Sequence, residues 1–183
     1  MMTQDTFIRG IWQRARNWRP DIWTVLLLAA IVYVWFRPPA WVSDENRVVP
    51  DRAFTLINGQ SLNLAQLRGK VVLVNIWATW CPYCRHEMPA MEAFYRDYRN
   101  KGFEIVALSQ DDGAEVVARF MSEKGYTFPS AMADPVVMTG LGEVSRLPTS
   151  FVIDRDGVIR HKISGQVHYA RLQDLVEPLL KLQ

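Results

Sequence analysis

The feature that most restricts the fold of this chain is a nearly unbroken apolar run, "KVVLVNIWA", at positions 70–78. A strand with one face in water alternates apolar and polar side chains. An unbroken run rich in β-branched residues is instead typical of a central strand that is buried on both faces. Such a strand needs a packed layer on each side of its sheet, so the run predicts an α/β domain. The composition fits a globular core, because 49% of the residues are apolar and 22% are charged.

Strand and helix patterns alternate around this run. The further expected elements are a hairpin over 53–64 that turns at Asn58-Gly59, a helix over 82–100 kinked by Pro89, a strand over 103–110, an amphipathic helix over 113–125, a hairpin over 149–163 that turns at Asp156-Gly157, and a helix over 169–182 with Pro178 inside it. Strand–helix–strand steps imply a parallel core, and the late hairpin adds antiparallel strands. We therefore expect a mixed central sheet flanked by helices on both faces.

The N-terminal part has the charge pattern of a membrane anchor. Residues 22–36 contain no charged side chain, and they follow a cluster of arginines, Arg9, Arg14, Arg16 and Arg19. Fifteen residues of helix rise only ~22 Å, which is less than the ~30 Å of a bilayer core. Residues 37–41 extend the span, and the aromatic residues at its edges are typical of membrane interfaces: Trp18, Trp23, Trp35 and Trp41.

A cleaved signal peptide and a buried core helix are the alternatives for this segment. Cleavage requires small residues after the apolar run, and the one suitable position, after Ala40, lies between Pro38 and Trp41. We therefore predict a transmembrane anchor over 22–41, a cytoplasmic segment over 1–21, a linker over 42–50 and a folded domain over 51–183. Because positive charge stays in the cytoplasm, the domain is expected in the bacterial periplasm.

Both cysteines of the chain, Cys81 and Cys84, follow directly after the apolar run, at the expected start of the next helix. A helix N-terminus presents unpaired N–H groups and a partial positive charge, which stabilise a thiolate. We therefore expect the pKa of Cys81 to lie below the ~8.5 of a free thiol. Cys84, one turn further on, is placed to attack a mixed disulfide formed at Cys81. Pro82 suits the first turn of a helix, and Tyr83 is less constrained.

The residues weigh against three other functions. A structural disulfide across two residues closes a very small loop and gives little chain-entropy stabilisation. A metal site needs three or four ligands, and none of the histidines, His86, His161 and His168, has a ligand spacing with the pair. The net charge of +2 gives no electrostatic argument for nucleic-acid binding.

The segment "VVLVNIWATWCPYCRHEMPAME" resembles the active-site segment of the thioredoxin superfamily, in its membrane-anchored TlpA/ResA-like (DsbE/CcmG-like) branch. The later segment "RLPTSFVIDRDGVIRHKISG" resembles a second segment of that branch. The resemblance extends from about Val48 to the C-terminus and implies a thioredoxin-like fold.

The resemblance also implies roles for matching residues. Cys81 is expected to be the attacking thiol and Cys84 the resolving thiol. Pro148 is expected to be a cis proline facing the disulfide, with the backbone of Leu147 pairing to an extended substrate. Trp80 is expected to pack beside the thiols, and Pro82 and Tyr83 lie between the cysteines at the substrate face.

Position 75, where thioredoxin has a buried aspartate, holds Asn75, which cannot exchange a proton. Some members of the branch use a glutamate three residues after the second cysteine, and Glu87 occupies that position. It shares a helix face with Cys84 and, if desolvated, could accept the Cys84 proton. An exposed helix glutamate is the alternative.

The resemblance favours a periplasmic thiol-disulfide oxidoreductase that reduces protein disulfides and needs no cofactor beyond the cysteine pair. It implies an inner-membrane electron donor of the DsbD or CcdA type, because the periplasm is kept oxidising. Cytochrome c maturation, copper-protein assembly and copper tolerance are its possible contexts. A thioredoxin-like copper chaperone and a disulfide-donating oxidase are the alternatives.

Overall fold

The computed structural model describes residues 21–36, 42–49 and 53–182. The chain divides into two units, Met1–Pro39 and Ala40–Gln183, and each is described by itself. In the first unit, helix α2 (Ile22–Phe36) begins after Asp21, whose carboxylate accepts a hydrogen bond from the Thr24 amide at 2.8 Å. Within the described ranges no helix combines the length and the apolar character that crossing a membrane requires.

Several N-terminal expectations fall outside the described residues. They include the arginine cluster, Trp18, Trp41 and the second part of the expected anchor, residues 37–41. The boundaries of the cytoplasmic segment, anchor and folded domain therefore stay predictions.

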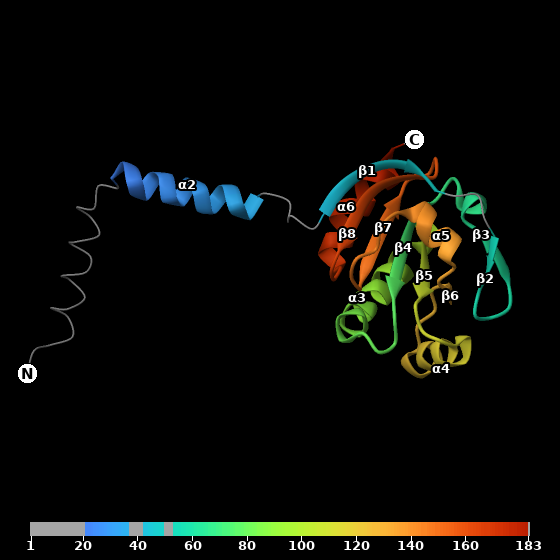
Figure 1. The fold of residues 1–183 in the computed structure, drawn as a ribbon. Helices are drawn as coiled ribbons and strands as arrows, with labels where there is room; N and C mark the ends of the chain where they lie inside the picture. Colours follow the sequence, from blue (N-terminus) through green and yellow to red (C-terminus); the bar gives the residue numbers. More distant parts are fainter. Residues whose placement is uncertain (1–20, 37–41, 50–52, 183) are drawn as a thin grey trace, which may run out of the picture. The chain divides into compact units, whose positions relative to one another are not determined.

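The second unit is built on a six-stranded sheet in the order β1-β8-β7-β4-β5-β6 (Figure 1). Strands β4, β5 and the edge strand β6 run parallel, whereas β7, β8 and β1 join by antiparallel pairing. The strands are β1 (Val42–Val48), β4 (Val71–Trp77), β5 (Phe103–Ser109), β6 (Ser130–Met132), β7 (Thr149–Ile153) and β8 (Val158–Ser164). The mixed sheet is thus confirmed.

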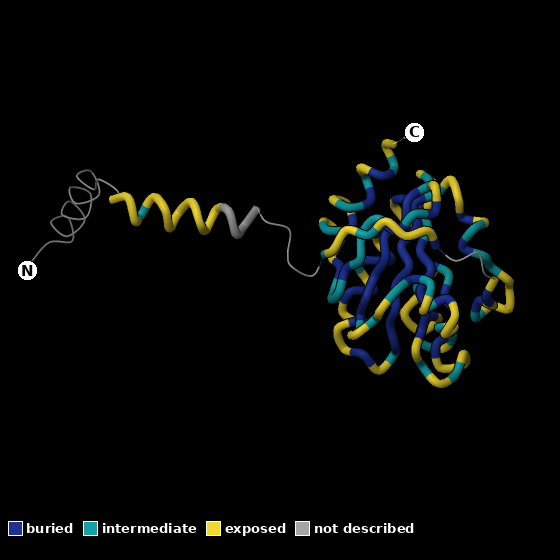
Figure 2. Tube along the Cα trace, turned by 45° about the horizontal axis from the view of Figure 1, so that its top comes forward, coloured by how far each residue is buried: buried dark blue, intermediate teal, exposed yellow. Residues whose placement is uncertain are grey.

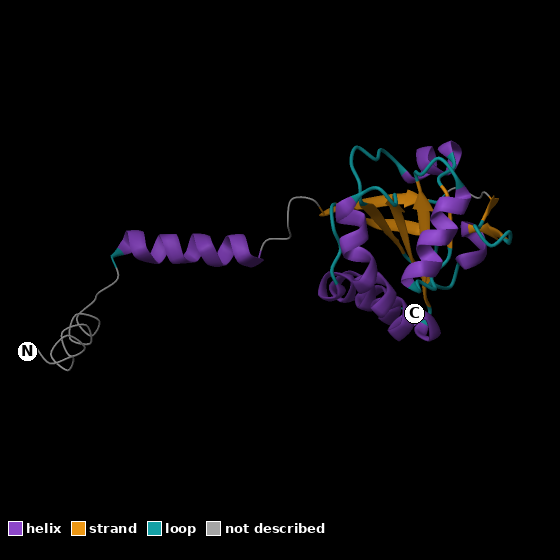
Figure 3. Ribbon diagram, turned by 90° about the horizontal axis from the view of Figure 1, so that it is seen from below, coloured by secondary structure: helices purple, strands orange, loops and turns teal. Residues whose placement is uncertain are grey.

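Strand β4 is buried along its whole length, as the apolar run predicted. Its side chains point alternately to the two faces of the sheet and belong to two different hydrophobic cores. Leu73 and Trp77 face α3 (Pro82–Tyr98), α4 (Ala114–Lys124) and α6 (Tyr169–Lys181). Val72 and Val74 face α5 (Pro135–Leu141), the short 3-10 helix η1 (Leu64–Leu67) and the first hairpin, over residues 53–63. Figure 2 shows the central strands of the sheet buried, in dark blue, and Figure 3 shows helices on both faces of the sheet.

Both predicted hairpins are confirmed. Strands β2 (Ala53–Thr55) and β3 (Ser61–Asn63) pair antiparallel around Asn58-Gly59, where Gly59 has a φ of +84°. Strands β7 and β8 pair around Asp156-Gly157, where Gly157 has a φ of +81°. Such left-handed backbone is easy for glycine, which is why these sequences indicated turns.

Residues 42–48, which were expected to belong to a linker, instead form the edge strand β1. Its register places Val42 opposite Ile163 and Val48 opposite Val158. Most side chains of β1 are exposed, so no apolar alternation marks it in the sequence. Main-chain pairing to β8, which is distant in the sequence, makes this segment a strand.

Two short elements, β6 and α5, were also not predicted. Helix α5 has a local signal, because Asp134 accepts hydrogen bonds from the amides of Val136 and Val137 at 2.8 and 3.1 Å, and Pro135 occupies the first helical position. Strand β6 has three residues and depends on its pairing with β5. The remaining short element is the 3-10 helix η2 (Arg99–Lys101), which continues α3.

Candidate active site

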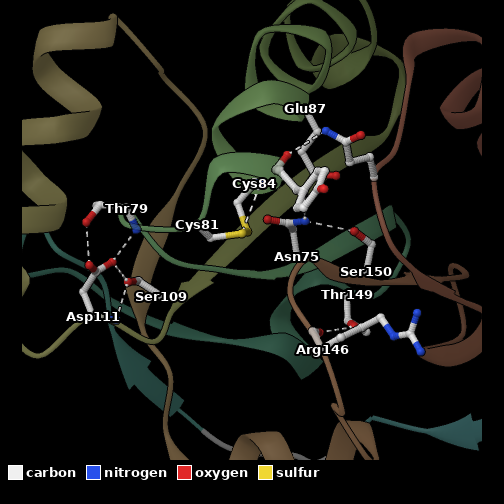
Figure 4. Close-up of a disulfide and its surroundings, with 12 residues drawn as sticks. Asn75, Thr79, Cys81, Cys84, Glu87, Ser109, Asp111, Arg146, Thr149 and Ser150 are labelled. Atoms are coloured by element: carbon white, nitrogen blue, oxygen red, sulfur yellow. Dashed lines mark hydrogen bonds between the residues drawn. A yellow bond between two sulfur atoms is a disulfide. The ribbon is translucent and has the colours of Figure 1, made fainter.

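Cys81 lies between the end of β4 and the start of α3, where the sequence predicted it (Figure 4). It is the N-cap residue of α3, and its Sγ accepts a hydrogen bond from the Cys84 amide at 3.2 Å. Pro82 occupies the first turn, where no N–H is lost. The helix N-terminus is therefore directed at the Cys81 sulfur, as a stabilised thiolate requires.

Cys81 and Cys84 form a disulfide, with their Cα atoms 5.3 Å apart. Cys84 is fully buried, whereas Cys81 retains 4% exposure. A thiolate arriving from solvent can therefore reach Cys81 but not Cys84. This asymmetry agrees with the predicted attacking and resolving roles, which stay predictions.

Glu87 lies one turn beyond Cys84 and is only 1% exposed, so the alternative of an exposed helix glutamate is wrong. Its Oε1 accepts a hydrogen bond from Asn75 Nδ2 at 2.8 Å, and its Oε2 accepts one from the Val167 amide at 2.8 Å. Burial raises the pKa of Glu87 from 4.5 to about 8, although both hydrogen bonds oppose the rise. Such a carboxyl group can exchange a proton near neutral pH.

Asn75 connects the centre of the sheet with this carboxyl group. Its Nδ2 also donates to Ser150 Oγ at 2.9 Å, across the register pair that joins β4 and β7. Its Oδ1 is buried and has no hydrogen-bond partner in the described part of the chain. Figure 4 shows this oxygen pointing toward the two sulfur atoms, on the opposite side of the amide from Ser150.

The loop before Cys81 is held by Asp111, a residue that the sequence analysis did not identify. Its carboxylate accepts hydrogen bonds from the Thr79 amide at 2.9 Å and the Thr79 hydroxyl at 2.5 Å. Ser109, the last residue of β5, donates to the same carboxylate at 2.6 Å. An acidic residue just after a buried strand, at the edge where the cysteines lie, is the local signal that could have identified it.

The peptide bond between Leu147 and Pro148 is cis, as the resemblance implied. Pro148 is buried, and its carbonyl accepts a hydrogen bond from the Gly165 amide at 2.9 Å. Leu147 is partly buried and packs against both cores. Its expected pairing with a substrate segment stays a prediction.

Three other expected site residues lie at the surface around the disulfide. Trp80 is 65% exposed and Tyr83 is 66% exposed, and Pro82 is also exposed. Trp80 was expected to pack beside the thiols; most of its side chain faces solvent, and this packing stays a prediction. The Tyr83 carbonyl accepts a hydrogen bond from Gln166 Nε2 at 3.0 Å, which ties the loop after β8 to the start of α3.

None of the histidines has an assigned role at the disulfide, and two of them have other surroundings. His161 lies 2.9 Å from an Asp44 oxygen on the neighbouring edge strand, and His86 is exposed on α3. In the described ranges, no three side chains of the types that bind metals form a cluster.

Comparison with known proteins identifies relatives of this chain. The Redoxin family model matches residues 44–176. Thiol-disulfide oxidoreductase ResA of Bacillus cereus is 36% identical over 130 residues, which are 71% of this chain and 75% of the relative. ResA of Bacillus subtilis (strain 168) is 32% identical over 138 residues, which are 74% of this chain and 77% of the relative.

A solved structure is also similar. The thiol:disulfide interchange protein of the thioredoxin family from Chlorobium tepidum TLS superposes with a TM-score of 0.69 and 29% identity. The match covers 75% of this chain and 99% of that chain.

Proposed function

Because the chain belongs to the Redoxin family and is a thiol-disulfide oxidoreductase of the TlpA/ResA-like branch, we propose that it reduces protein disulfides in the bacterial periplasm, tethered to the inner membrane. The observation that carries the exchange chemistry is the Cys81–Cys84 pair at the N-terminus of α3, with the buried carboxyl group of Glu87 one turn beyond Cys84. The cysteines themselves are the redox group, as in the thioredoxin fold generally.

Reduction proceeds in two exchanges. The Cys81 thiolate attacks one sulfur of a substrate disulfide, forms a mixed disulfide and releases the other substrate sulfur as a thiolate, which takes a proton from water. Cys84 then loses its proton to Glu87 and attacks the Cys81 sulfur. The second substrate thiol is released, so the substrate gains two electrons and two protons while the enzyme becomes the disulfide.

Glu87 is suited to the second exchange. Cys84 is fully buried, so water cannot remove its proton directly. Cys84 and Glu87 stand three residues apart in α3 and therefore share a helix face. With its pKa raised to about 8, the Glu87 carboxylate can hold the proton until the substrate thiol leaves.

The reaction must be resupplied with electrons, because the product is the oxidised enzyme in an oxidising compartment. We propose that an inner-membrane transporter of the DsbD or CcdA type supplies them. Cytochrome c maturation, copper-protein assembly and copper tolerance are processes that need such a reductant.

The membrane tether in this proposal is the uncharged segment 22–36, extended by residues 37–41 and preceded by four arginines. Its test is fractionation of the full-length chain after alkaline extraction of membranes. A chain that remains in the membrane pellet supports the tether, and one that is released contradicts it.

The midpoint potential of the Cys81/Cys84 couple tests the direction of electron flow. A potential near about −250 mV supports a reductase, and one near about −120 mV would identify a disulfide-donating oxidase.

A further inference from the structure

A hollow of about 430 Å³ lies on the surface of the domain beside the active-site helix. One of its lining residues, Pro82, directly follows Cys81 in the chain. Residues of α3 form one wall of the hollow, and residues at the end of α4 form the other. Its remaining lining includes the cationic side chains Arg85 and Lys124 and the aromatic side chains Phe120 and Tyr126.

The hollow is positively charged. Among the described residues no acidic side chain lines it, and His86 adds a ring that can donate a hydrogen bond. In the part of the chain that the structure describes, neither Arg85 nor Lys124 takes part in an ion pair. Two unpaired cations at one concave surface attract an anionic group and disfavour a cationic one.

The aromatic wall holds one of these charges in place. The Arg85 guanidinium lies 5.9 Å from the centre of the Phe120 ring, within the range of a cation–π contact. Phe120 in turn lies 5.5 Å from the buried ring of Trp77, the last residue of β4. The exposed Arg85 side chain therefore has an aromatic contact on the wall of the hollow, and that wall packs against the core.

The hollow is also one helical turn from the reacting sulfur. The Arg85 amide donates a hydrogen bond to the Cys81 carbonyl at 3.1 Å. A protein substrate joined to Cys81 through a mixed disulfide must pass close to this surface. An extended chain covers about 3.3–3.6 Å per residue, so a side chain two or three residues from the substrate cysteine can reach the hollow.

We propose that this hollow binds an acidic side chain of the protein substrate, close in sequence to the cysteine that exchanges with Cys81. This inference rests on the proposed function, because it requires protein substrates. It adds a determinant of specificity on the α4 side of the disulfide. Leu147 and Pro148 belong to a different part of the site, because they precede β7, and β7 borders β4 on the side away from β5.

The test compares peptides that carry one internal disulfide and differ only in residues two and three positions from each cysteine, which are Glu, Gln or Lys. The reduced full-length protein in a neutral detergent reacts with each peptide in single turnover, and the second-order rate constants are measured. Hydroxyethyl disulfide, a small neutral substrate, reports on the exchange chemistry without any flanking residue.

We expect the Glu peptide to react faster than the Gln peptide, by up to about fivefold for each ion pair formed. In the double variant Arg85→Gln/Lys124→Gln this ratio falls to near one. In the charge-reversed variant Arg85→Glu/Lys124→Glu the Lys peptide becomes the faster substrate. Arg119→Gln is the matched control, because Arg119 is exposed on α4 but does not line the hollow, and it keeps the wild-type ratio.

Equal rates for the Glu and Gln peptides in the wild type overturn the docking site and leave the proposed function intact. Reaction with hydroxyethyl disulfide but with none of the peptides contradicts protein substrates, and with them the whole proposal. If the double variant loses binding to vesicles of anionic lipid but keeps its preference for the Glu peptide, the hollow faces the membrane and the docking site is wrong.

Discussion

Asn75 Nδ2 donates a hydrogen bond of 2.8 Å to Glu87 Oε1, and this bond joins the centre of the sheet to the active-site helix beside the disulfide. The amide also donates to Ser150 Oγ on β7, so one side chain connects β4, β7 and α3. A buried carboxyl group is therefore held in a fixed place by neutral donors. Its protonation is the property that the replacements of Glu87 and Asn75 below are designed to measure.

Replacement of Glu87 by glutamine is expected to remove a pH dependence of stability. The pKa of Glu87 is about 8 in the folded protein, above its ordinary 4.5, so the folded state binds more protons between these values. Protonation of Glu87 therefore stabilises the folded state fully below about pH 4.5, and this stabilisation is lost as pH rises toward 8. The free energy of unfolding should fall over this range by on the order of 4 kcal/mol. Denaturant unfolding of the oxidised full-length protein at several pH values between 5 and 8.5 measures this decline.

Glu87→Gln should flatten this decline. Its absolute stability should fall, because the glutamine side chain has a single acceptor oxygen and cannot accept from both the Asn75 side chain and the Val167 amide. Glu115→Gln is the control, because Glu115 is exposed on α4 and should keep the wild-type pH dependence. An undiminished decline in Glu87→Gln would show that another group titrates.

Asn75→Ala is expected to move the same decline to higher pH. The hydrogen bond from Asn75 stabilises the ionised carboxylate, so its loss raises the pKa of Glu87 further. The variant should also lose about 1–3 kcal/mol of stability, because a buried carboxyl oxygen is left unpaired. Ser150→Ala keeps the bond to Glu87 and should leave the pH range unchanged. A shift of equal size in both variants would refute a specific role for the Asn75–Glu87 bond.

The two cysteines are expected to give opposite results when replaced. Cys81→Ser should abolish exchange, because the attacking sulfur is lost. Cys84→Ser should accumulate mixed disulfides with protein substrates, because the resolving thiol is absent. Non-reducing electrophoresis after acid quenching measures both outcomes. An active Cys81→Ser variant together with no trapped species in Cys84→Ser would mean that the roles are reversed.

Asp111→Ala is expected to loosen the loop that precedes Cys81. The variant leaves the Thr79 amide and hydroxyl without their acceptor, which should cost about 1–3 kcal/mol. Alkylation of Cys81 in the reduced protein should change its rate as well, because the N-cap position of the sulfur is no longer held. Asp112→Ala, at the exposed neighbouring position, serves as the control. Unchanged alkylation in Asp111→Ala would show that the loop is held by other contacts.

The elements that were predicted correctly are those with a local cause. The apolar run at 70–78 became the buried strand β4, and Asn58-Gly59 and Asp156-Gly157 became hairpin turns. The cysteine pair lies at the start of α3 because a strand signal ends and a helix signal begins there. In each case the deciding residues are neighbours in the sequence, so their pattern is visible without the fold.

The sequence by itself therefore determined the α/β alternation, the position of Cys81 at a helix N-terminus and, through resemblance, the cis bond before Pro148. Only the tertiary structure decided that residues 42–48 form a strand, because β8 supplies their pairing partners. It also decided that Glu87 is buried, since its two hydrogen bonds come from residues 12 and 80 positions away. Desolvation of a carboxyl group depends on what packs around it in space, and no spacing of residues within one helix encodes that.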